Sequence, residues 1–404
     1  MKSQQLVLLF STIILTIFSI TILLSLPKNI MAAVENSCIS YNSIENEISV
    51  ACQGAEFIDI DNSLQDQNIL QRETSNFNEK NWILKAGIYV EKNATLSINS
   101  HDVTWLKIVP SENTPNAIEV DGSLKVDSVK ITSWNPQTND YVYFSDAVKY
   151  DELQYTKELR PYIKVNSGAT GPTIIQNSEL AYLGYKCSGC GGLTFHGGEF
   201  SMLLNNDIHH IYKGFYSKGM GYMLIEGNHV YNNDKYGIDP HTGTHHMLIL
   251  NNTVHDNGSS GIICSLDCYY ILIEGNEVYN NGADGPGRGI AFSINMYHSV
   301  AKNNYVHHQN KCIGVSGGSH DNEIHDNQVS NCEVGLYTSQ ESYNNNVYNN
   351  IIKNIINGIV VKTGAYDNAF HYNKIVNASE GGILKVEDPG TAGNTFENNN
   401  VNMH

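Results

Sequence analysis

The chain has 404 residues and a formal net charge of −17, with 41 Asp and Glu against 24 Lys and Arg. This acidic balance excludes nucleic acid as the partner, because phosphate backbones are bound by clustered Lys and Arg. Only 16% of the residues are charged, whereas Asn is abundant and Gly numbers 34, which favours a turn-rich β protein over a helical one.

The N-terminal segment has the pattern of an export signal. Lys2 precedes the nearly uncharged apolar run Leu6–Leu26, and the small residues Ala32 and Ala33 follow. This pattern predicts a signal peptide or an N-terminal membrane anchor over residues 1–33. The rest of the chain is then secreted or membrane-anchored outside the cytosol, and the membrane is a partner only through this segment. Residues 34–80 are mixed and polar, and we assign them to an N-terminal segment or cap.

Eight cysteines occur in this exported chain. Cys38 and Cys52 are expected to form a local disulfide. Cys187 and Cys190 form a CxxC, but the chain has no second CxxC, so a zinc knuckle is not expected. The other four lie within the repeats described next and are expected to be free, buried thiols: Cys264, Cys268, Cys312 and Cys332.

From Trp82 onward, short apolar pieces alternate with turn residues, which predicts strands, and residues 135–158 look like an inserted loop. A repeat becomes clear from about residue 173. One marker is an Asn that recurs every 22 to 28 residues, at Asn206, Asn228, Asn252, Asn276, Asn304, Asn327, Asn350 and Asn373. A second marker keeps step with the first, at Gly192, Gly214, Gly237, Gly261, Gly289, Gly314, Gly335 and Gly358.

These repeats predict a stacked architecture built from strands. The segment Leu224–Asn228 alternates apolar and polar residues, and no helical period is sustained. Leucine-rich repeats would need regular Leu and a helix in each unit, and both are missing. We therefore expect an all-β fold, a right-handed parallel β-helix with coils of about 22–24 residues over residues 81–404. The residue after each repeat Gly is always apolar and is expected to point inward.

Stacked coils place residues at equal offset from the repeat Gly in columns, roughly 4.8 Å apart. Positions two and four after the Gly should then face outward. Three such columns meet at the hexapeptide Tyr236–His241, which reads YGIDPH. The columns are His196, Lys218, His241, Ser265 and Ser293; Thr194, Tyr216, Asp239, Ile263 and Ala291; and Lys213, Tyr236, Ser260 and Arg288.

Charge supports a polysaccharide groove over residues 186–311. This window holds seven Lys or Arg and ten Asp or Glu, a balance of −3, so the remaining residues carry −14. Eleven of the 16 His also lie here. We expect the groove to bind an anionic polysaccharide through His196, Lys213, Tyr216, His245 and His246. Four further His are expected at solvated turns: His209, His210, His307 and His308.

The hexapeptide within β-helix repeats resembles the YG(F/I)DPH signature of the mannuronan C5-epimerases. The resemblance covers about residues 160–380 and is sharpest from Asp207 to Asn304. It implies a poly(β-D-mannuronate) C5-epimerase, an isomerase that inverts C5 to give guluronate residues within the polymer. It also implies that Tyr236 and His241 serve as the base and the acid on opposite faces of the sugar ring. Which of the two is the base stays open.

The same resemblance suggests the remaining catalytic roles. Arg288 matches an Arg of the secreted epimerases and is expected to neutralise the substrate carboxylate, with Lys218 as the second choice. Asp239 is expected to orient His241 or to bind a sugar hydroxyl. The chain departs from the family pattern at three positions. Gly289 follows Arg288 in place of His, Ser260 stands where the periplasmic enzymes have Arg, and Thr242 replaces an acid.

Two other functions stay open. A polyuronate (alginate-type) lyase would use the same Tyr and His and then expel the 4-O-linked sugar. A non-catalytic glycan-binding or surface-structural β-helix would suit the anchor-like N-terminus. No cofactor is expected to be required and no metal site is assigned, although acidic turns such as Asp256-Asn257-Gly258 could hold Ca²⁺. We expect a monomer.

Overall fold

The computed structural model describes residues 38–73, 80–111, 115–143, 159–282, 287–385 and 390–402. The signal or anchor predicted for residues 1–33 lies outside these ranges, as does most of the insertion expected at 135–158. Among the described helices, none combines the length and the apolar character needed to span a bilayer.

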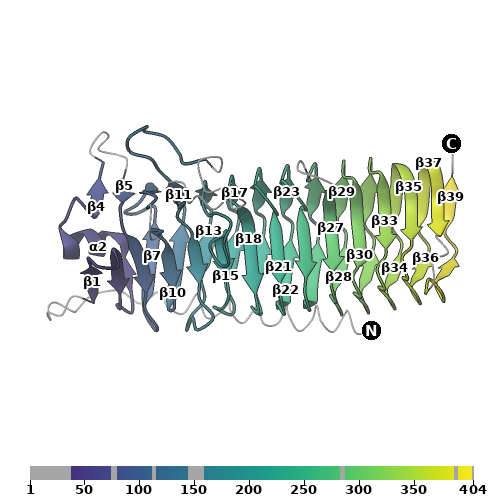
Figure 1. The fold of residues 1–404 in the computed structure, drawn as a ribbon, viewed down its shortest axis with the longest axis horizontal. Helices are drawn as coiled ribbons and strands as arrows, with labels where there is room; N and C mark the ends of the chain where they lie inside the picture. Colours follow the sequence, from purple (N-terminus) through teal and green to yellow (C-terminus); the bar gives the residue numbers. More distant parts are fainter. Residues whose placement is uncertain are drawn as a thin grey trace, which may run out of the picture. The chain divides into compact units, whose positions relative to one another are not determined.

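Coils of three short strands follow one another along the chain and form the predicted parallel β-helix (Figure 1). The strands of successive coils pair in three parallel rows. The first row is a separate sheet of 13 strands: β3 (Ala55–Glu56), β7 (Thr95–Asn99), β10 (Ser123–Asp127), β13 (Ile174–Gln176), β16 (Met202–Leu204), β19 (Leu224–Glu226), β22 (His245–Leu250), β25 (Tyr269–Glu274), β28 (Val300–Lys302), β31 (Glu323–His325), β34 (Asn346–Tyr348), β36 (Ala369–His371) and β38 (Thr395–Glu397).

The second and third rows belong to a sheet of 26 strands. The second row comprises β5 (Asn81–Leu84), β8 (Trp105–Ile108), β11 (Lys130–Ser133), β14 (Glu179–Ala181), β17 (Asp207–His209), β20 (His229–Tyr231), β23 (Thr253–His255), β26 (Glu277–Tyr279), β29 (Tyr305–His307), β32 (Gln328–Ser330) and β39 (Asn400–Asn402). The third row comprises β2 (Glu47–Val50), β6 (Gly87–Val90), β9 (Ile118–Val120), β12 (Ile163–Val165), β15 (Gly192–Phe195), β18 (Lys213–Lys218), β21 (Ile238–His241), β24 (Ile262–Ser265), β27 (Arg288–Ser293), β30 (Lys311–Ser316) and β33 (Val334–Thr338). Two long strands, β35 (Ile351–Val361) and β37 (Lys374–Lys385), run through both rows.

The N-terminal residues close one end of this stack. The strand β1 (Ile39–Asn42) pairs with β2 in antiparallel orientation, and β4 (Leu70–Arg72) pairs with β5 in the same way. Between them lies the helix α2 (Phe57–Leu64), whose Phe57 and Ile60 are buried. The Phe57 ring packs edge-on against Trp82, with ring centroids 5.7 Å apart. A helix on the first coil covers apolar surface and strand edges that would otherwise face water.

The repeated Asn residues form a buried ladder at the corner between the first and second rows. The side-chain amide of Asn228 donates to Asn252 Oδ1 at 3.0 Å and to the Leu203 carbonyl at 2.8 Å. Similar bonds extend the ladder to Asn399, and a second ladder of Asn233, Asn257 and Asn281 lies at the next corner. Each Asn thus satisfies backbone groups that the turn leaves unpaired.

The apolar position after each repeat Gly points inward, as predicted: Leu193, Phe215, Ile238, Ile262 and Ile290 are all fully buried. The assignment at Gly314 was wrong. Ile290 pairs with Ile313 and Ala291 pairs with Gly314, so Cys312 occupies the repeat-Gly position of that coil. The sequence spacing of 25 followed by 21 residues had concealed this two-residue shift.

Three disulfides close within the described chain. Cys38–Cys52 confirms the expected pair, and Cys187 bonds to Cys190. The expectation of a free thiol was wrong for the other pair, since Cys312 bonds to Cys332. The prediction holds for the remaining two residues, which are free and buried: Cys264 and Cys268.

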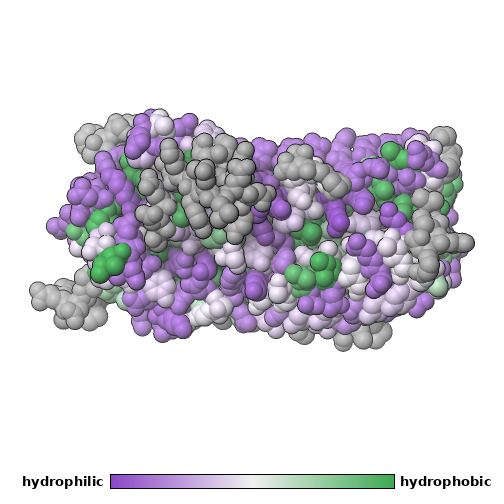
Figure 2. All heavy atoms as spheres, in the orientation of Figure 1, coloured by the Kyte–Doolittle hydropathy of each residue, from purple (hydrophilic) through white to green (hydrophobic). Residues whose placement is uncertain are grey.

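The surface in Figure 2 is largely hydrophilic, with only isolated hydrophobic spots. The exposed large apolar side chains are correspondingly scattered: Ile44, Tyr143, Phe200, Ile294, Tyr305, Ile356, Tyr372 and Val401. Two of the His residues expected in solvated turns instead lie within strands. His209 ends β17 and is 9% exposed, and His307 ends β29.

Candidate active site

The hexapeptide lies on the third row, and the strand register produces the predicted columns. In the pairing of β18 with β21, Tyr216 is opposite Asp239 and Lys218 is opposite His241. In the next pairing, His241 is opposite Ser265. The phenol, carboxylate and imidazole of one coil therefore lie beside the cations of the coil before it.

Asp239 is fully buried, although its position was expected to face outward into an open groove. The Lys213 Nζ donates to Asp239 Oδ2 at 3.1 Å. Burial raises the pKa of Asp239 to about 6, and the positive charges of Lys213 and Lys235 limit the rise. Its second oxygen, Oδ1, is buried without a hydrogen-bond partner in the described structure. The contact of Asp239 with a sugar hydroxyl therefore stays a prediction, because this oxygen is covered in the structure.

Lys213 is surrounded by aromatic rings as well as by the Asp239 carboxylate. Its Nζ lies 3.9 Å from the ring centroid of Tyr216 and 5.6 Å from that of Tyr236. Cation–π contact and an ion pair thus hold this ammonium in one place. Lys213 is thus engaged with Asp239, and its predicted contact with substrate stays a prediction.

The environment of His241 favours a neutral imidazole. Burial lowers the pKa of His241, and the nearby charges of Lys213 and Lys218 lower it further. Its Nδ1 lies 2.6 Å from Thr242 Oγ1, so a hydrogen bond to the hydroxyl fixes the ring. Thr242 has a φ of 39°, an uncommon left-handed conformation for a β-branched residue. Thr242 therefore holds the imidazole through Nδ1, and no described hydrogen bond joins His241 to Asp239.

The environment of Tyr236 favours a protonated phenol. Burial raises the pKa of Tyr236 and the charge of Asp239 adds to the rise, whereas Arg288 and a hydrogen bond from Ser259 oppose it. The ring is partly buried, and Lys235 Nζ lies 5.8 Å from its centroid. A phenol and an imidazole in these states form an acid and base pair at neutral pH.

Arg288 follows Tyr236 and Ser260 in adjacent coils. Backbone hydrogen bonds from Gly237 to the Ser260 carbonyl and from Gly261 to the Arg288 carbonyl fix this column. Arg288 therefore occupies the column that the sequence predicted for it. Arg288 is close enough to Tyr236 to lower the pKa of the phenol.

The structure adds a second cation that the sequence reasoning missed. Lys311 is directly opposite Arg288 in the pairing of β27 with β30. The side chains of both approach the buried Tyr337, with Arg288 Cζ 6.0 Å and Lys311 Nζ 4.9 Å from its ring centroid. Burial lowers the pKa of Lys311, and Arg288 and Lys362 lower it further. The misassigned Gly314 concealed this neighbour, because it displaced the Lys311 column.

The remaining predicted binding residues divide into two groups. His196 and Tyr216 lie next to the hexapeptide, since the Tyr216 ring is 6.2 Å from His196 and 5.5 Å from His241. His245 and His246 lie past the next corner, where the first-row strand begins. Their rings stack on Tyr residues of neighbouring coils, with His245 5.0 Å from Tyr269, and no described contact joins them to Asp239.

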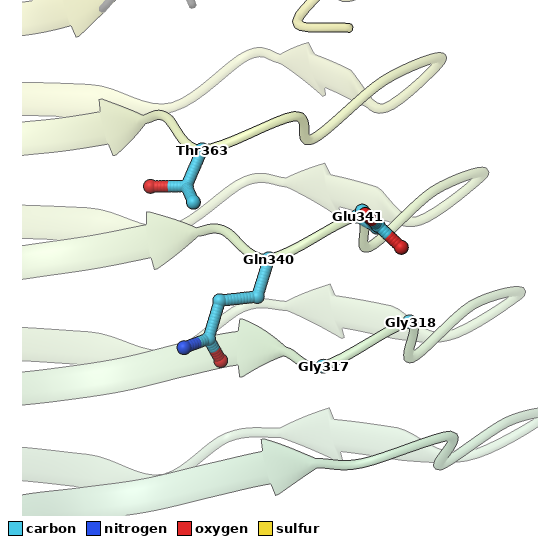
Figure 3. Close-up of a pocket in the computed structure, with 5 residues that line it drawn as sticks. All are labelled: Gly317, Gly318, Gln340, Glu341 and Thr363. Atoms are coloured by element: carbon cyan, nitrogen blue, oxygen red, sulfur yellow. The ribbon is translucent and has the colours of Figure 1, made fainter.

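A shallow hollow of about 440 Å³ lies further along the stack, at turns that follow third-row strands (Figure 3). Its lining is Gly317, Gly318, Gln340, Glu341 and Thr363. In Figure 3, Gln340 and Thr363 project to the same side of the turns and Glu341 projects to the other. One carboxylate and two glycines provide no acid and base pair, so the hexapeptide remains the candidate site.

Comparison with known proteins agrees with this architecture. The family model for the right-handed beta helix region matches residues 166–329 and 241–401. A mannuronan C5-epimerase of Pseudomonas fluorescens is 27% identical over 137 residues, which are 31% of this chain and 24% of that protein. The chain therefore matches about a quarter of the length of this curated relative.

Solved structures resemble the fold over most of the chain. The periplasmic alginate epimerase AlgG superposes with a TM-score of 0.72 at 18% identity, covering 89% of this chain and 85% of that one. A single-residue mutant of the same epimerase gives 0.73 at 17% identity, covering 87% and 85%. A GH136 lacto-N-biosidase from Eubacterium ramulus gives 0.50 at 11% identity, covering 79% and 63%. At these identities the likeness concerns the fold.

Proposed function

We propose that this chain, which belongs to the right-handed β-helix family, is a poly(β-D-mannuronate) C5-epimerase. The observation that carries the proposal is the single cluster of Tyr236, Asp239 and His241, flanked by Lys218 and Arg288. The partial match to a mannuronan C5-epimerase and the fold shared with a periplasmic alginate epimerase support it.

The protonation states suggest which residue removes the proton. His241 is neutral at neutral pH because its pKa is lowered, so its imidazole can accept H5 of the sugar. Tyr236 keeps its proton because its pKa is raised, so its phenol can return a proton to C5 on the opposite face. The C5–H bond breaks, the electron pair is held on the carboxylate as an enolate, and a new C5–H bond forms with inverted configuration. Solvent exchange then restores both side chains.

The substrate carboxylate must be neutralised for H5 to become acidic. Lys213 is already paired with Asp239, so this role falls to Arg288 or Lys218. The guanidinium of Arg288 is the better candidate, because its fork can bind both carboxylate oxygens and because it reaches the Tyr236 side of the site.

We place the enzyme outside the cytosol, with a polyuronate as its substrate. Three disulfides within the described residues suit an oxidising compartment, and the export signal predicted for residues 1–33 agrees with it. One structural neighbour is described as periplasmic.

The test is proton NMR of polymannuronate incubated with the purified protein in D₂O, with ultraviolet absorbance of unsaturated sugars followed on the same samples. We expect guluronate signals, deuterium at C5 and no gain in absorbance. His241→Ala and Tyr236→Phe should each reduce the rate by roughly 10²- to 10⁴-fold. His325→Ala is the matched control, since this His also bonds through Nδ1 to the next residue but lies on the first row.

Two outcomes would replace the proposal. Rising absorbance lost in His241→Ala would make the chain a polyuronate lyase that uses the same residues. An unchanged polymer, with and without calcium and across other uronate polymers, would leave glycan binding as the function.

A further inference from the structure

A buried guanidinium is bonded to the turn that carries Tyr236. Arg160 precedes β12, and its side chain is 1% exposed. Its Nε donates to the Gly184 carbonyl at 2.6 Å, its Nη1 to the His210 carbonyl at 3.1 Å and its Nη2 to Asp234 Oδ2 at 3.1 Å. These three acceptors belong to the turns between the second and third rows in three successive coils. The last of the three turns holds Tyr236.

The backbone on both sides of Arg160 is itself held in place. The Leu159 N–H donates to the Ser111 carbonyl at 3.1 Å, and the Pro161 carbonyl accepts from the Gly184 N–H at 2.7 Å. A guanidinium removed from water costs free energy unless acceptors meet its N–H groups. Two carbonyls and a carboxylate provide such acceptors, and hydrogen bonds from a charged donor are among the stronger ones in proteins. Arg160 therefore gives the three turns a common attachment.

The turn that leads to Tyr236 holds one residue more than the turn in the preceding coil. Gly237 follows Asn228 by nine residues, whereas Gly214 follows Asn206 by eight. A longer turn has more conformations open to it, so ordering it costs more entropy. The position of Tyr236 therefore depends on a contact that selects one of these conformations.

The next coil has a turn of the same length, and its sequence differs at the anchored position. The second Asn ladder, together with the backbone bonds, places Gly258 opposite Asp234. Ser260 is opposite Tyr236 in the same alignment. Glycine has no side chain that could accept from a guanidinium. The carboxylate therefore occurs in the turn that presents the phenol, and not in the turn of equal length that presents Ser260.

We propose that Arg160 is a positioning residue, which holds Tyr236 at its face of the sugar through Asp234. The role rests on the proposed function, in which the Tyr236 phenol returns a proton to C5. Such a transfer needs the donor within hydrogen-bond reach, and a displacement of about 1 Å can lower a rate by roughly 100-fold. Only Lys235 lies between Asp234 and Tyr236 in the chain, so a shift of the anchor carries over to the phenol. Arg160 is buried and is not expected to contact the sugar itself.

The first test compares Arg160→Met with the wild type in the epimerisation of polymannuronate. We expect kcat to fall by roughly 10- to 100-fold with little change in KM, because the phenol acts in the transition state. Arg160→Lys, which keeps the charge and can bond one of the acceptors, should recover part of the loss. The matched control is Lys107→Met, which removes another buried cation paired with a carboxylate, Glu73, at 2.8 Å. Both Met variants should lower Tm, but Lys107→Met should keep the wild-type kcat.

A double-substitution cycle separates positioning from a loss of stability. In a Tyr236→Phe background, Arg160→Met should change kcat by less than roughly twofold, because the phenol that Arg160 positions is already absent. An equal fold-loss in both backgrounds would overturn the proposal. Should Arg160→Met fail to fold, Asp234→Ala carries the same cycle, since the Asp234 side chain is 25% exposed.

A second measurement does not depend on activity. Carbon NMR of protein labelled at Tyr Cζ, with the Tyr236 signal assigned by its loss in Tyr236→Phe, reports the surroundings of the phenol. We expect this signal to move in Arg160→Met and to stay in place in Lys107→Met. An unmoved signal in Arg160→Met would contradict the role of Arg160. If the wild type leaves polymannuronate unchanged, the proposed function fails, while this measurement still decides whether Arg160 positions Tyr236.

Discussion

The two titrating side chains of the hexapeptide differ in the direction of their pKa shifts, and this difference sets the pH range of activity. A base whose pKa lies below 6.5 and an acid whose pKa lies above 10.0 are both in their working states between those values. Activity should therefore rise on the acidic side through the pKa of His241 and stay level to alkaline pH.

Replacing Lys218 by Met tests that assignment. Loss of this cation raises the pKa of His241, because a nearby positive charge disfavours the imidazolium. The acidic limb of the kcat/KM profile should move to higher pH, and only modestly because Lys218 is exposed. Lys302→Met, which removes a cation paired with Glu274 on the first row, should leave the limb in place. An unmoved limb in Lys218→Met would argue against His241 as the base.

The buried carboxylate of Asp239 should lower the free energy of unfolding at neutral pH. Its folded pKa of about 6 lies above the usual 3.8, so its favourable contribution is complete below pH 3.8 and is lost as the pH rises through 6. The stability of Asp239→Asn relative to the wild type should therefore increase as the pH rises from 4 to 7. The difference in the free energy of unfolding should grow by at most ~3 kcal/mol, and the Tm of the variant should rise relative to that of the wild type. Thermal unfolding at several pH values measures this, with the exposed Asp267→Asn as the control. A pH-independent difference would contradict the assignment.

At the scale of strands, β27, β30 and β33 bring Arg288, Lys311 and Tyr337 together beyond the hexapeptide. A uronate polymer carries one carboxylate per sugar, so Lys311 suits the carboxylate of the sugar next to the one that Arg288 is proposed to bind. Lys311→Met should raise KM for polymannuronate several-fold and change kcat little, because the contact is shared by ground state and transition state. A fall in kcat without a change in KM would place Lys311 in the chemical step.

Gly314 controls the position of Tyr337 in the same strands. A Cβ on Gly314 would collide with the Tyr337 ring atoms Cε1 and Cζ. Gly314→Ala should displace the ring and raise KM as Lys311→Met does. The control is Gly54→Ala, where a Cβ would meet nothing within 4 Å. Binding equal to the wild type in Gly314→Ala would show that Tyr337 does not shape the sugar site.

The strands also show what could be predicted from the sequence. The Asn and Gly markers and the apolar position that includes Ile238 predicted the coils, because each reflects a contact repeated in every turn. The columns through Lys218 and His241 followed directly. The markers did not predict that Lys311 lies opposite Arg288. The spacings of 25 and 21 residues on either side of Gly314 add up to two ordinary coils, so they conceal that Cys312 replaces the repeat Gly there.

Other features depend on contacts that no repeat encodes. The full burial of Asp239 and its bond to Lys213 of the preceding coil involve side-chain contacts that the period of the repeat does not specify. The hydrogen bond between His241 and Thr242 involves a residue with an unusual φ of 39°, which no repeat marker signals. The disulfide between Cys312 and Cys332 depends on residues from different coils meeting at a corner.

For the whole molecule, each coil contacts mainly its neighbours, so the position of a defect matters. Asn252→Ala interrupts the Asn ladder: the Asn228 backbone N–H loses its acceptor, and the Ile225 carbonyl loses the bond from the Asn252 amide. We expect a loss of a few kcal/mol, from roughly 1–3 kcal/mol per unsatisfied buried group, and a broadened or split calorimetric transition. Asn399→Ala at the end of the same ladder should fray only the last coil. Equal effects would mean that the stack unfolds as a single unit.

The Cys312–Cys332 disulfide changes how the stack responds to force. If the C-terminus were pulled, the coils would unfold one after another from that end. At Cys332 the disulfide links the chain covalently to Cys312 in the preceding coil. Unwinding would pause there, with the coils that carry Arg288, Tyr236 and His241 still wound. The Cys312–Cys332 disulfide therefore separates the C-terminal coils, which unfold first, from the coils that carry the proposed active site.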